Sequence, residues 1–176
     1  AVARVARATQ RLSGVVTDLI SLALVDDADR SLPDRLVDLR EACHAAAELL
    51  SIRAARAGIA LVEEYSGDLW TTGDAAEIER VMINLVGNAV KYTEAGGTVR
   101  VSARTDGDDA VVEVSDDGIG ISPEDRERLF TEFFRTDNPQ ARSREGTGLG
   151  LVIAARIIAR HGGRVEVESE LGSGST

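Results

Sequence analysis

One stretch of the sequence, residues 75–92, carries two carboxamides and an ammonium group at helical spacing. In a helix, which turns by about 100° per residue, Asn84, Asn88 and Lys91 fall within one narrow stripe. Amide carbonyl oxygens are ligands that Mg²⁺ accepts while it keeps several waters and binds phosphate oxygens. Lys91 is then placed to neutralise phosphate charge, and Tyr92 to cover an aromatic base. Taken alone, the pattern also suits a solvated polar stripe.

An aspartate and two glycines directly follow an expected strand in the segment Asp116-Asp117-Gly118-Ile119-Gly120-Ile121. The glycines let the backbone turn sharply and approach a ligand closely. A carboxylate at the end of a strand can accept a hydrogen bond from an exocyclic amine, which suits adenine. Because strand-to-helix turns often contain Asp-Gly, the motif alone is a weak indication of a nucleotide site.

Two further turns are rich in glycine. Residues 146–151 read Gly-Thr-Gly-Leu-Gly-Leu and enter an expected helix, whose first amide groups attract phosphate. This turn is not a Walker loop, because no Gly-Lys-Ser/Thr closes it, and no strand precedes it as in a dinucleotide fingerprint. Residues 172–176 form a small-residue turn that alone would also suit a linker.

Hydrophobic periodicity predicts the elements that position these motifs. A heptad seam in residues 1–25 predicts a bundle-forming helix; its members are Val2, Val5, Thr9, Leu12, Val16, Leu19 and Ala23. A polar hinge closed by Pro33 follows. Further helices are expected at 36–57, 75–92 and 147–161, with a short one after 122–123. Strands are expected at 59–65, 69–71, 98–104, 110–115 and 164–169, with a hairpin turn at 106–109 and a mobile loop at 136–145.

Composition and charge limit the classes of function. The 176 residues, 43% hydrophobic and 28% charged, suit one globular domain with a short extra element. A net charge of −10 opposes the basic surface typical of nucleic-acid binders, so no nucleic-acid partner is expected. No stretch approaches the roughly 20 apolar residues of a membrane span. We therefore expect the chain to be cytoplasmic, although a parent protein could be membrane-anchored.

In this order, the motifs resemble those of bacterial-type sensor histidine kinases, which belong to the GHKL superfamily of ATPases and kinases. Residues 84–93 resemble the N box, 116–120 the first glycine box, 130–135 the F box, 146–150 the second glycine box and 172–174 the third. The implied fold is an α/β (α+β) sandwich, with a mixed, largely antiparallel sheet covered on one face by three helices and preceded by one long bundle-forming helix. Residues 1–30 resemble the second helix of a dimerisation and phosphotransfer domain. Residues 31–176 resemble the ATP-binding catalytic domain, with its C-terminal strand truncated.

The resemblance also implies roles for single residues. Asn84, Asn88 and Lys91 would be catalytic, with Asn88 as the Mg²⁺ ligand. Asp116 would accept the adenine amino group beside Tyr92. The residues implied to bind ATP are Asn84, Asn88, Lys91, Tyr92, Asp116, Gly118, Gly120, Ile121, Arg135, Thr147, Gly148, Leu149 and Gly150.

A lid over ATP is implied for residues 136–147. Arg135, Arg142 and Arg144 are candidates for phosphate contacts, although a solvated surface charge explains each of them equally well. Phe130 is expected in the core, and Phe133 and Phe134 as anchors of the lid.

The implied reaction is transfer of the ATP γ-phosphoryl group to a histidine on the first helix of the dimerisation domain. The implied partners are ATP, a response regulator receiver domain and the chain's own dimerisation domain, which forms a homodimer in the parent protein. Hydrolytic relatives usually have a glutamate general base where Asn84 stands, which favours transfer over hydrolysis. Anti-sigma-factor serine kinases lack the preceding helix, and an ATP-binding module that regulates by shape alone is the non-enzymatic alternative.

The two histidines and the single cysteine are expected to be structural. His44 precedes three alanines and not the acidic, basic and proline residues of a phosphoacceptor site, so we expect a helix-surface residue. His161 precedes two glycines at a helix end, where a polar side chain is favourable. Cys43 lies in an apolar helical pattern, which predicts a small core residue.

Overall fold

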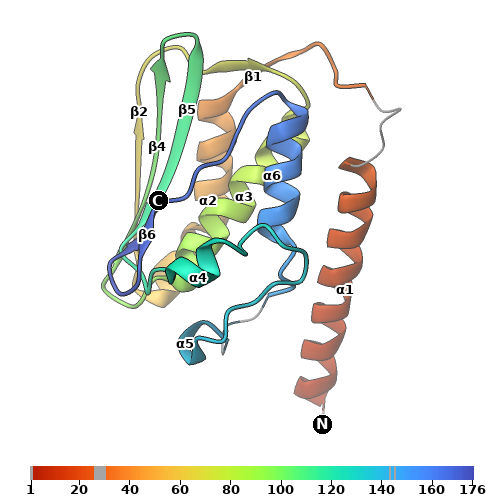
Figure 1. The fold of residues 1–176 in the computed structure, drawn as a ribbon, viewed down its shortest axis with the longest axis vertical. Coiled ribbons are helices and arrows are strands. Elements are labelled where there is room, and N and C mark those ends of the chain that lie inside the picture. Colours follow the sequence, from red (N-terminus) through yellow and green to blue (C-terminus); the bar gives the residue numbers. More distant parts are fainter. Residues whose placement is uncertain (1, 26–30, 143, 145) are drawn as a thin grey trace.

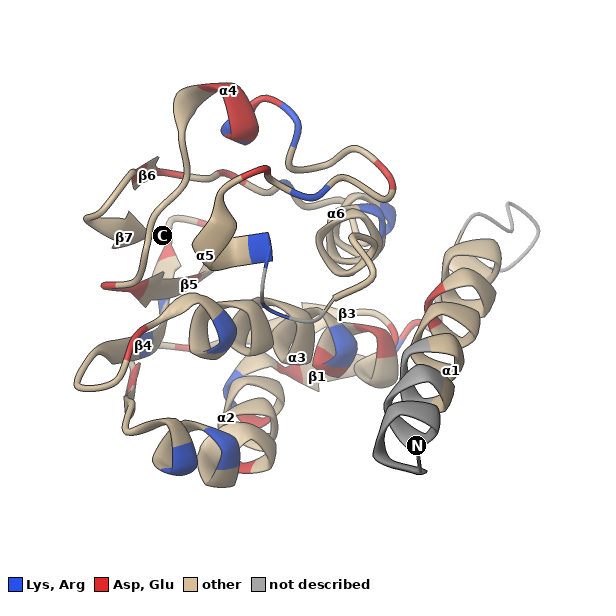
Figure 2. Ribbon diagram, turned by 90° about the horizontal axis from the view of Figure 1, so that it is seen from below, with Lys and Arg blue, Asp and Glu red and all other residues tan. Residues whose placement is uncertain are grey.

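A computed structural model describes residues 2–25, 31–142, 144 and 146–176. Its order of elements is α1 (Val2–Val25), β1 (Leu36–Asp38), α2 (Leu39–Ala57), β2 (Ala60–Tyr65), β3 (Trp70–Thr72), α3 (Ala75–Tyr92), β4 (Thr98–Asp106), β5 (Asp109–Asp116), α4 (Pro123–Arg126), α5 (Pro139–Arg142), α6 (Gly150–Arg160), β6 (Ser169–Glu170) and β7 (Gly174–Ser175). Helices α2, α3 and α6 cover one face of a sheet, while α1 stands beside α6 and away from the sheet (Figures 1 and 2). This arrangement confirms the expected two-layer fold.

The main sheet has the strand order β2-β4-β5-β7-β6. Strand β2 runs parallel to β4, and the other three pairings are antiparallel, so the sheet is mixed and largely antiparallel as expected. The expected hairpin joins β4 to β5 through a two-residue turn, since Asp106 pairs with Asp109. The parallel pair requires a long crossover, and α3 lies within it.

Helix α3 packs its apolar side into the core between the sheet and its neighbouring helices. Ile78, Val81, Met82 and Ala89 expose at most 8% of their surface, and Leu85 packs against them while half-buried. These five residues are the apolar arc that the helical period predicts. Much of the rest of the core comes from the apolar residues of α2 and α6 and from Val99 and Val101 of β4. The remaining core residues are Leu22, Val37, Ile59, Val86, Val90 and Leu149.

Helix α2 begins three residues later than the sequence indicates. Residues 36–38 are apolar enough to extend the helical pattern, but they form β1 and pair antiparallel with β3. The side chain of Asp38 then accepts the backbone N–H of Arg40 at 2.8 Å, which caps α2. Helix α6 likewise begins at Gly150 and not at Thr147, whose hydroxyl accepts the N–H of Leu149 at 3.2 Å.

The expected strand at 164–169 is wrong for most of its length. Burial alternates as expected, with Val165 and Val167 half-buried between exposed neighbours. Within this range, however, only Ser169 belongs to a strand, β6, which pairs with β7. Glu168 adds two backbone hydrogen bonds with Thr176, at 2.9 and 2.8 Å, and residues 164–167 form no strand. Alternation therefore reports which side chains face inward, but not whether a neighbouring strand is present to pair with.

The loop expected at 136–145 contains a short helix, α5. Asn138 caps it, since its Oδ1 accepts the N–H of Gln140 at 2.9 Å, and Pro139 is the first helical residue. The expected mobility of this segment remains a prediction, and residues 143 and 145 lie outside the described part of the chain.

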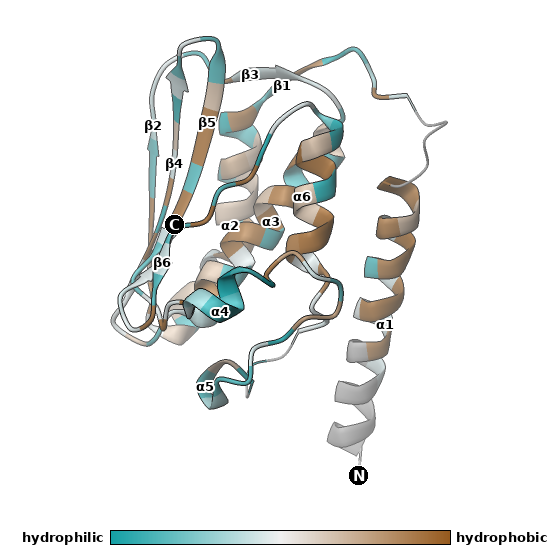
Figure 3. Cartoon of the chain, viewed as in Figure 1, coloured by the Kyte–Doolittle hydropathy of each residue, from teal (hydrophilic) through white to brown (hydrophobic). Residues whose placement is uncertain are grey.

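Helix α1 contacts the rest of the chain through its last turns. Ser21 and Leu22 are each 8% exposed, whereas Leu12, Val16 and Leu19 of the heptad seam expose 66, 47 and 43%. Apolar residues run along the described half of α1 (Figure 3). The side chains of the expected seam residues 2 and 5 lie outside the described residues. Among the helices that the structure describes, none has the length and apolarity that crossing a membrane requires.

Two polar contacts join the end of α6 to the beginning of α3. Nε2 of His161 accepts the backbone N–H of Asp74 at 3.1 Å, and Nδ1 lies 2.8 Å from the carbonyl of Ile157. Since Nε2 must accept, Nδ1 is the protonated nitrogen and donates to that carbonyl. Arg160 and Glu77 form an ion pair at 2.7 Å, with side chains only 13 and 10% exposed. The structural role expected for His161 is therefore confirmed.

Replacing Gly73 with alanine is expected to lower the free energy of unfolding by about 1–3 kcal/mol. A Cβ atom at this position would lie 2.2 Å from Cδ2 and 2.4 Å from Nε2 of His161, so the ring would have to leave the Asp74 amide. Denaturant titration measures the loss. In a His161→Ala background the space is free, so the same substitution should cost clearly less. Equal costs in the two backgrounds would contradict the steric explanation.

Candidate nucleotide site

A cavity of about 890 Å³ lies between α3, β5, α6 and the segment that contains α5. Figure 2 shows the basic end of α5 between these three elements. The cavity gathers eleven of the expected ATP-binding residues: Asn84, Asn88, Lys91, Tyr92, Asp116, Gly120, Ile121, Arg135, Thr147, Gly148 and Gly150. They come from four separate segments of the sequence, which only the fold brings together.

On the α3 wall, Asn84 has an unsatisfied polar group. Its amide nitrogen Nδ2 is buried and has no hydrogen-bond partner among the described residues. Asn84 faces the start of α6, because a Cβ atom on Gly150 would lie 3.3 Å from its Oδ1. Buried donors without a partner are costly in folded proteins, so this nitrogen is suited to a ligand acceptor.

Lys91 and Tyr92 form one unit at the end of α3. The lysine Nζ donates to the tyrosine hydroxyl at 2.7 Å and lies 4.4 Å from the centre of the ring. Below them, Arg144 donates to the backbone carbonyls of Lys91 and Thr93. A cation at the carbonyl end of a helix is favourable, so Arg144 caps α3.

Close to Tyr92 at the end of α3, Asp116 is a partly buried carboxylate. Burial raises the pKa of Asp116, and the nearby charge of Asp117 raises it further. Hydrogen bonds from the backbone N–H groups of Gly118 and Ser175 lower the pKa, but the net shift is upward because burial is the largest effect. The Gly118 N–H lies 2.9 Å from Oδ1. Gly120 has a φ of 64°, and a Cβ atom on it would lie 1.9 Å from the carbonyl oxygen of Glu170. Only glycine fits there, which confirms that the turn requires close backbone approach.

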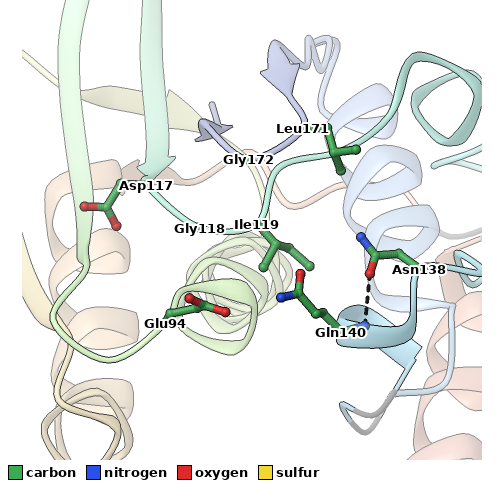
Figure 4. Close-up of a pocket in the computed structure, with 8 residues that line it drawn as sticks. All are labelled: Glu94, Asp117, Gly118, Ile119, Asn138, Gln140, Leu171 and Gly172. Carbon is green, nitrogen blue, oxygen red and sulfur yellow. Dashed lines mark hydrogen bonds between the residues drawn. The ribbon is translucent and has the colours of Figure 1, made fainter.

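A second pocket of about 380 Å³ adjoins the cavity, with which it shares Ile119, Asn138 and Leu171. It contains Gly118, one of the two expected ATP-binding residues that the larger cavity lacks. Figure 4 shows the side chains of Ile119, Asn138 and Gln140 around this opening, between the first glycine box and α5. The shared residues make the pocket a mouth of the same site.

The arginines near α5 are engaged with the protein itself. Arg135 donates to the backbone carbonyls of Arg142 and Arg144 at 3.1 and 2.8 Å. Arg142 forms an exposed ion pair with Asp137 at 3.4 Å. Arg135 and Arg142 line the cavity, whereas Arg144 caps α3, and the expected contacts of these arginines with phosphate stay a prediction.

Two expectations for hydrophobic residues are wrong. Phe130 was expected in the core but is 41% exposed, because α4 ends at Arg126 and the chain continues through surface turns. Phe133 is 55% exposed and does not anchor the lid. Phe134 lines the cavity, and the guanidinium of Arg128 lies 4.5 Å from its ring centre, so its expected role as a lid anchor stays a prediction.

The structure places the remaining candidates away from the cavity. Leu149 is fully buried in the core, where it supports the turn without lining the site. Cys43 is also fully buried, and burial raises the pKa of its thiol to about 12, as suits a core residue. His44 is exposed on α2 with its Nδ1 3.0 Å from Glu63, which confirms a surface position.

Asp18 of α1 also lines the cavity, although no sequence motif indicated it. Its carboxylate accepts hydrogen bonds from Arg80 of α3 and from Thr147 of the second glycine box. The signal available in the sequence was weak: Asp18 is the only acidic residue in the helical stretch 2–25.

Comparison with known proteins supports one family. The model of the family described as histidine kinase-, DNA gyrase B-, and HSP90-like ATPase matches residues 73–176. The sensor histidine kinase RppB of Synechocystis sp. is 36% identical over 172 residues, which are 97% of this chain and 38% of that protein. The sensor-like histidine kinase SenX3 of Mycobacterium tuberculosis is 37% identical over 167 residues, 94% of this chain and 40% of that protein.

Among solved structures, full-length ShkA in complex with AMPPNP matches with a TM-score of 0.81 at 36% identity. The match covers 93% of this chain and 34% of the ShkA chain. The present chain thus spans about two fifths of the length of the curated relatives it matches.

Because burial raises the pKa of Asp116, this carboxylate is expected to lower stability at neutral pH. Its stabilising contribution is complete below the unfolded pKa, ordinarily 3.8, and is lost as the pH rises through the folded value. Asp116→Asn should therefore unfold at a higher temperature than the parent at pH 7, with a difference that shrinks towards pH 4. Thermal unfolding followed by circular dichroism tests this. A less stable variant at pH 7 would show that the hydrogen bonds outweigh burial.

Proposed function

The chain belongs to the histidine kinase-, DNA gyrase B-, and HSP90-like ATPase family, and from this premise we propose that its cavity binds ATP with Mg²⁺ for γ-phosphoryl transfer to a protein histidine. The family and the sensor histidine kinase relatives identify the ATP-binding catalytic domain of such a kinase. The observation that carries the proposal is the single cavity lined by Asn84, Asn88 and Lys91, by Asp116 and by the start of α6.

The adenine end of the site would lie at Asp116. A carboxylate accepts hydrogen bonds but does not donate them when ionised, so it selects a base with an amino group at the contacted position. A Cβ atom at Gly118 or Gly120 would collide with the backbone of Tyr92 or Glu170, so the two glycines allow the turn to pack closely against these residues. A flat base would lie against this turn, with Tyr92 lining the same cavity.

The phosphates would lie between α3 and the start of α6. The amide groups at the N-terminus of α6 carry partial positive charge. Lys91 adds a full positive charge, and the buried Nδ2 of Asn84 supplies a donor that has no protein partner among the described residues. In a chain with a net charge of −10, such local groups are what allow a polyanion to bind.

Mg²⁺ would be held by the amide oxygen of Asn88 together with phosphate oxygens and water. Asn88 lines the cavity one helical turn from Asn84 and on the same side as Lys91. This donor set suits a hard cation that binds through few protein oxygens and keeps several waters. When bound, the ion would neutralise charge on the transferring phosphoryl group.

Transfer is favoured over hydrolysis because of Asn84. A general base must take a proton from the attacking water, and a carboxamide cannot do so at neutral pH. The chain's own contribution would consist of positioning the nucleotide and stabilising its charge. An external hydroxyl or water is then a poor acceptor compared with an imidazole brought into line.

For the whole protein, we propose that residues 1–30 form the second helix of a dimerisation domain and residues 31–176 the catalytic domain. The exposed apolar seam at Leu12, Val16 and Leu19 would then be buried in a homodimer. The phosphohistidine would pass its phosphoryl group to the receiver domain of a response regulator. All of these steps would take place in the cytoplasm, where ATP is available.

Calorimetric titration is expected to show that the chain binds ATP and ADP in the presence of Mg²⁺. Asp116→Ala should weaken binding by about 10- to 100-fold, since a hydrogen bond to a charged group is lost. GTP, which has a carbonyl in place of the amino group, should bind at least about tenfold more weakly. Asp106→Asn is the matched control for loss of charge and should change neither affinity. Equal binding of GTP, or no effect of Asp116→Ala, would refute the adenine assignment.

The 176-residue chain is expected to bind ATP without labelling itself. Both of its histidines are engaged by protein groups, His44 by Glu63 on the exposed side of α2 and His161 by the Asp74 amide and the Ile157 carbonyl. Incubation with γ-labelled ATP and Mg²⁺ should leave no acid-labile phosphate on the protein, whereas a separate acceptor-helix peptide should become labelled. His44→Gln and His161→Gln are the controls. Stoichiometric labelling that either substitution removes would contradict this assignment of the acceptor.

A further inference from the structure

The carboxylate of Asp18 joins α1 to two walls of the nucleotide cavity. Its Oδ1 accepts from Nη2 of Arg80 on α3 at 3.2 Å, and its Oδ2 accepts from the hydroxyl of Thr147 at 2.7 Å. Asp18 itself lines the cavity, and its side chain is 21% exposed. A negative charge from α1 is therefore held inside the space proposed for a polyanion.

The hydroxyl of Thr147 is fully engaged by these contacts. Its oxygen accepts the N–H of Leu149 at 3.2 Å, and its proton is directed to Asp18. Thr147 lies in the turn that enters α6, where amide groups favour an anion. The Asp18 carboxylate thus has contacts that a phosphate group in this cavity would also make.

The turn of α1 that follows Asp18 fixes the helix to the domain. Ser21 and Leu22 are each 8% exposed, and Leu22 belongs to the apolar core. Val25 packs against the same core. The exposed seam residues Leu12 and Val16 take no part in this docking, so it is compatible with a separate use of the seam.

We propose that Asp18 is a latch between α1 and the second glycine box: docking of α1 weakens nucleotide binding, and the phosphates of a bound nucleotide release α1. This inference rests on the proposed function for the location of the phosphates. Two like charges compete for the Thr147 hydroxyl and for the N-terminus of α6. Because coupling between two binding events is reciprocal, the nucleotide loosens the docked helix by the same factor by which docking weakens the nucleotide.

Two variants release the latch in different ways. Asp18→Asn removes the charge and keeps the shape, whereas Leu22→Ala loosens the docked helix from outside the cavity. Both should bind Mg-ADP about fivefold more tightly than the parent, at the lower end of typical coupling between sites. Asp34→Asn, an exposed aspartate, is the charge-matched control and should leave the affinity unchanged. Calorimetry supplies the affinities.

Hydrogen exchange at the amides of residues 18–25 reports docking directly. In the unsubstituted chain, Mg-ADP should speed exchange at these amides. In Asp18→Asn, exchange should already be fast without nucleotide. Unchanged or weaker Mg-ADP binding by Asp18→Asn would overturn the latch. Tighter binding by Asp18→Asn with no change in Leu22→Ala would also overturn it, since the effect would then be charge repulsion without docking.

The experiments distinguish a failure of the nucleotide assignment from a failure of the docking contact. In the first case, Mg-ADP binds to neither the parent nor the variants, which refutes the proposed function. Exchange without nucleotide then decides whether Asp18 holds α1. Equal exchange in the unsubstituted chain and in Asp18→Asn would overturn the docking contact as well, whereas faster exchange in the variant would support the contact and leave only its coupling to a nucleotide refuted.

Discussion

The site depends on one constraint, which is that α3 must bury one side and present another to a ligand. Val81, Val86 and Ala89 are each at most 4% exposed, so rotation of the helix about its axis would move apolar surface into water. With that rotation fixed, the positions of Asn84 and Asn88 follow from the helical period alone. The polar stripe is therefore positioned by the core, and the residues around it supply the other walls.

The fold was predictable wherever the sequence of a single element determines which of its side chains are buried. The apolar arc of α3 follows from the helical period, and the N-cap Asp74 accepts the backbone N–H groups of Ala76 and Glu77, so both are local features. Prediction failed where a distant strand decides the outcome. Residues 36–38 pair with β3, and Val165 alternates in burial without a strand beside it. Periodicity records the environment of side chains, whereas backbone pairing depends on a partner elsewhere in the chain.

The candidate site was predictable as a set of motifs, but not as a set of contacts. Motif residues from four segments line one cavity, yet Leu149 from the same motif is buried in the core. The basic residues illustrate why the contacts could not be predicted. Arg144 caps α3 by donating to backbone carbonyls, and no sequence pattern indicates such a contact. Asp18 was missed because its partner Thr147 lies 129 residues away in the sequence. Type and spacing indicate possible chemistry, and the pairing of side chains is a tertiary property.

The two ends of helix α6 make different kinds of contact with the rest of the protein. At its end, His161 and the buried pair of Arg160 with Glu77 fix it to α3, and its middle lies in the core. Just before its beginning, the hydroxyl of Thr147 donates a hydrogen bond to the carboxylate of Asp18 on α1, whose described side chains are mostly exposed. Moving α6 as a unit would break the buried ion pair of Arg160 with Glu77, which would cost free energy. At Thr147, by contrast, a nucleotide phosphate would only replace the carboxylate of Asp18 as the hydrogen-bond acceptor. Any response to nucleotide is therefore expected in α1 and in the turn before α6, while α6 itself stays in place.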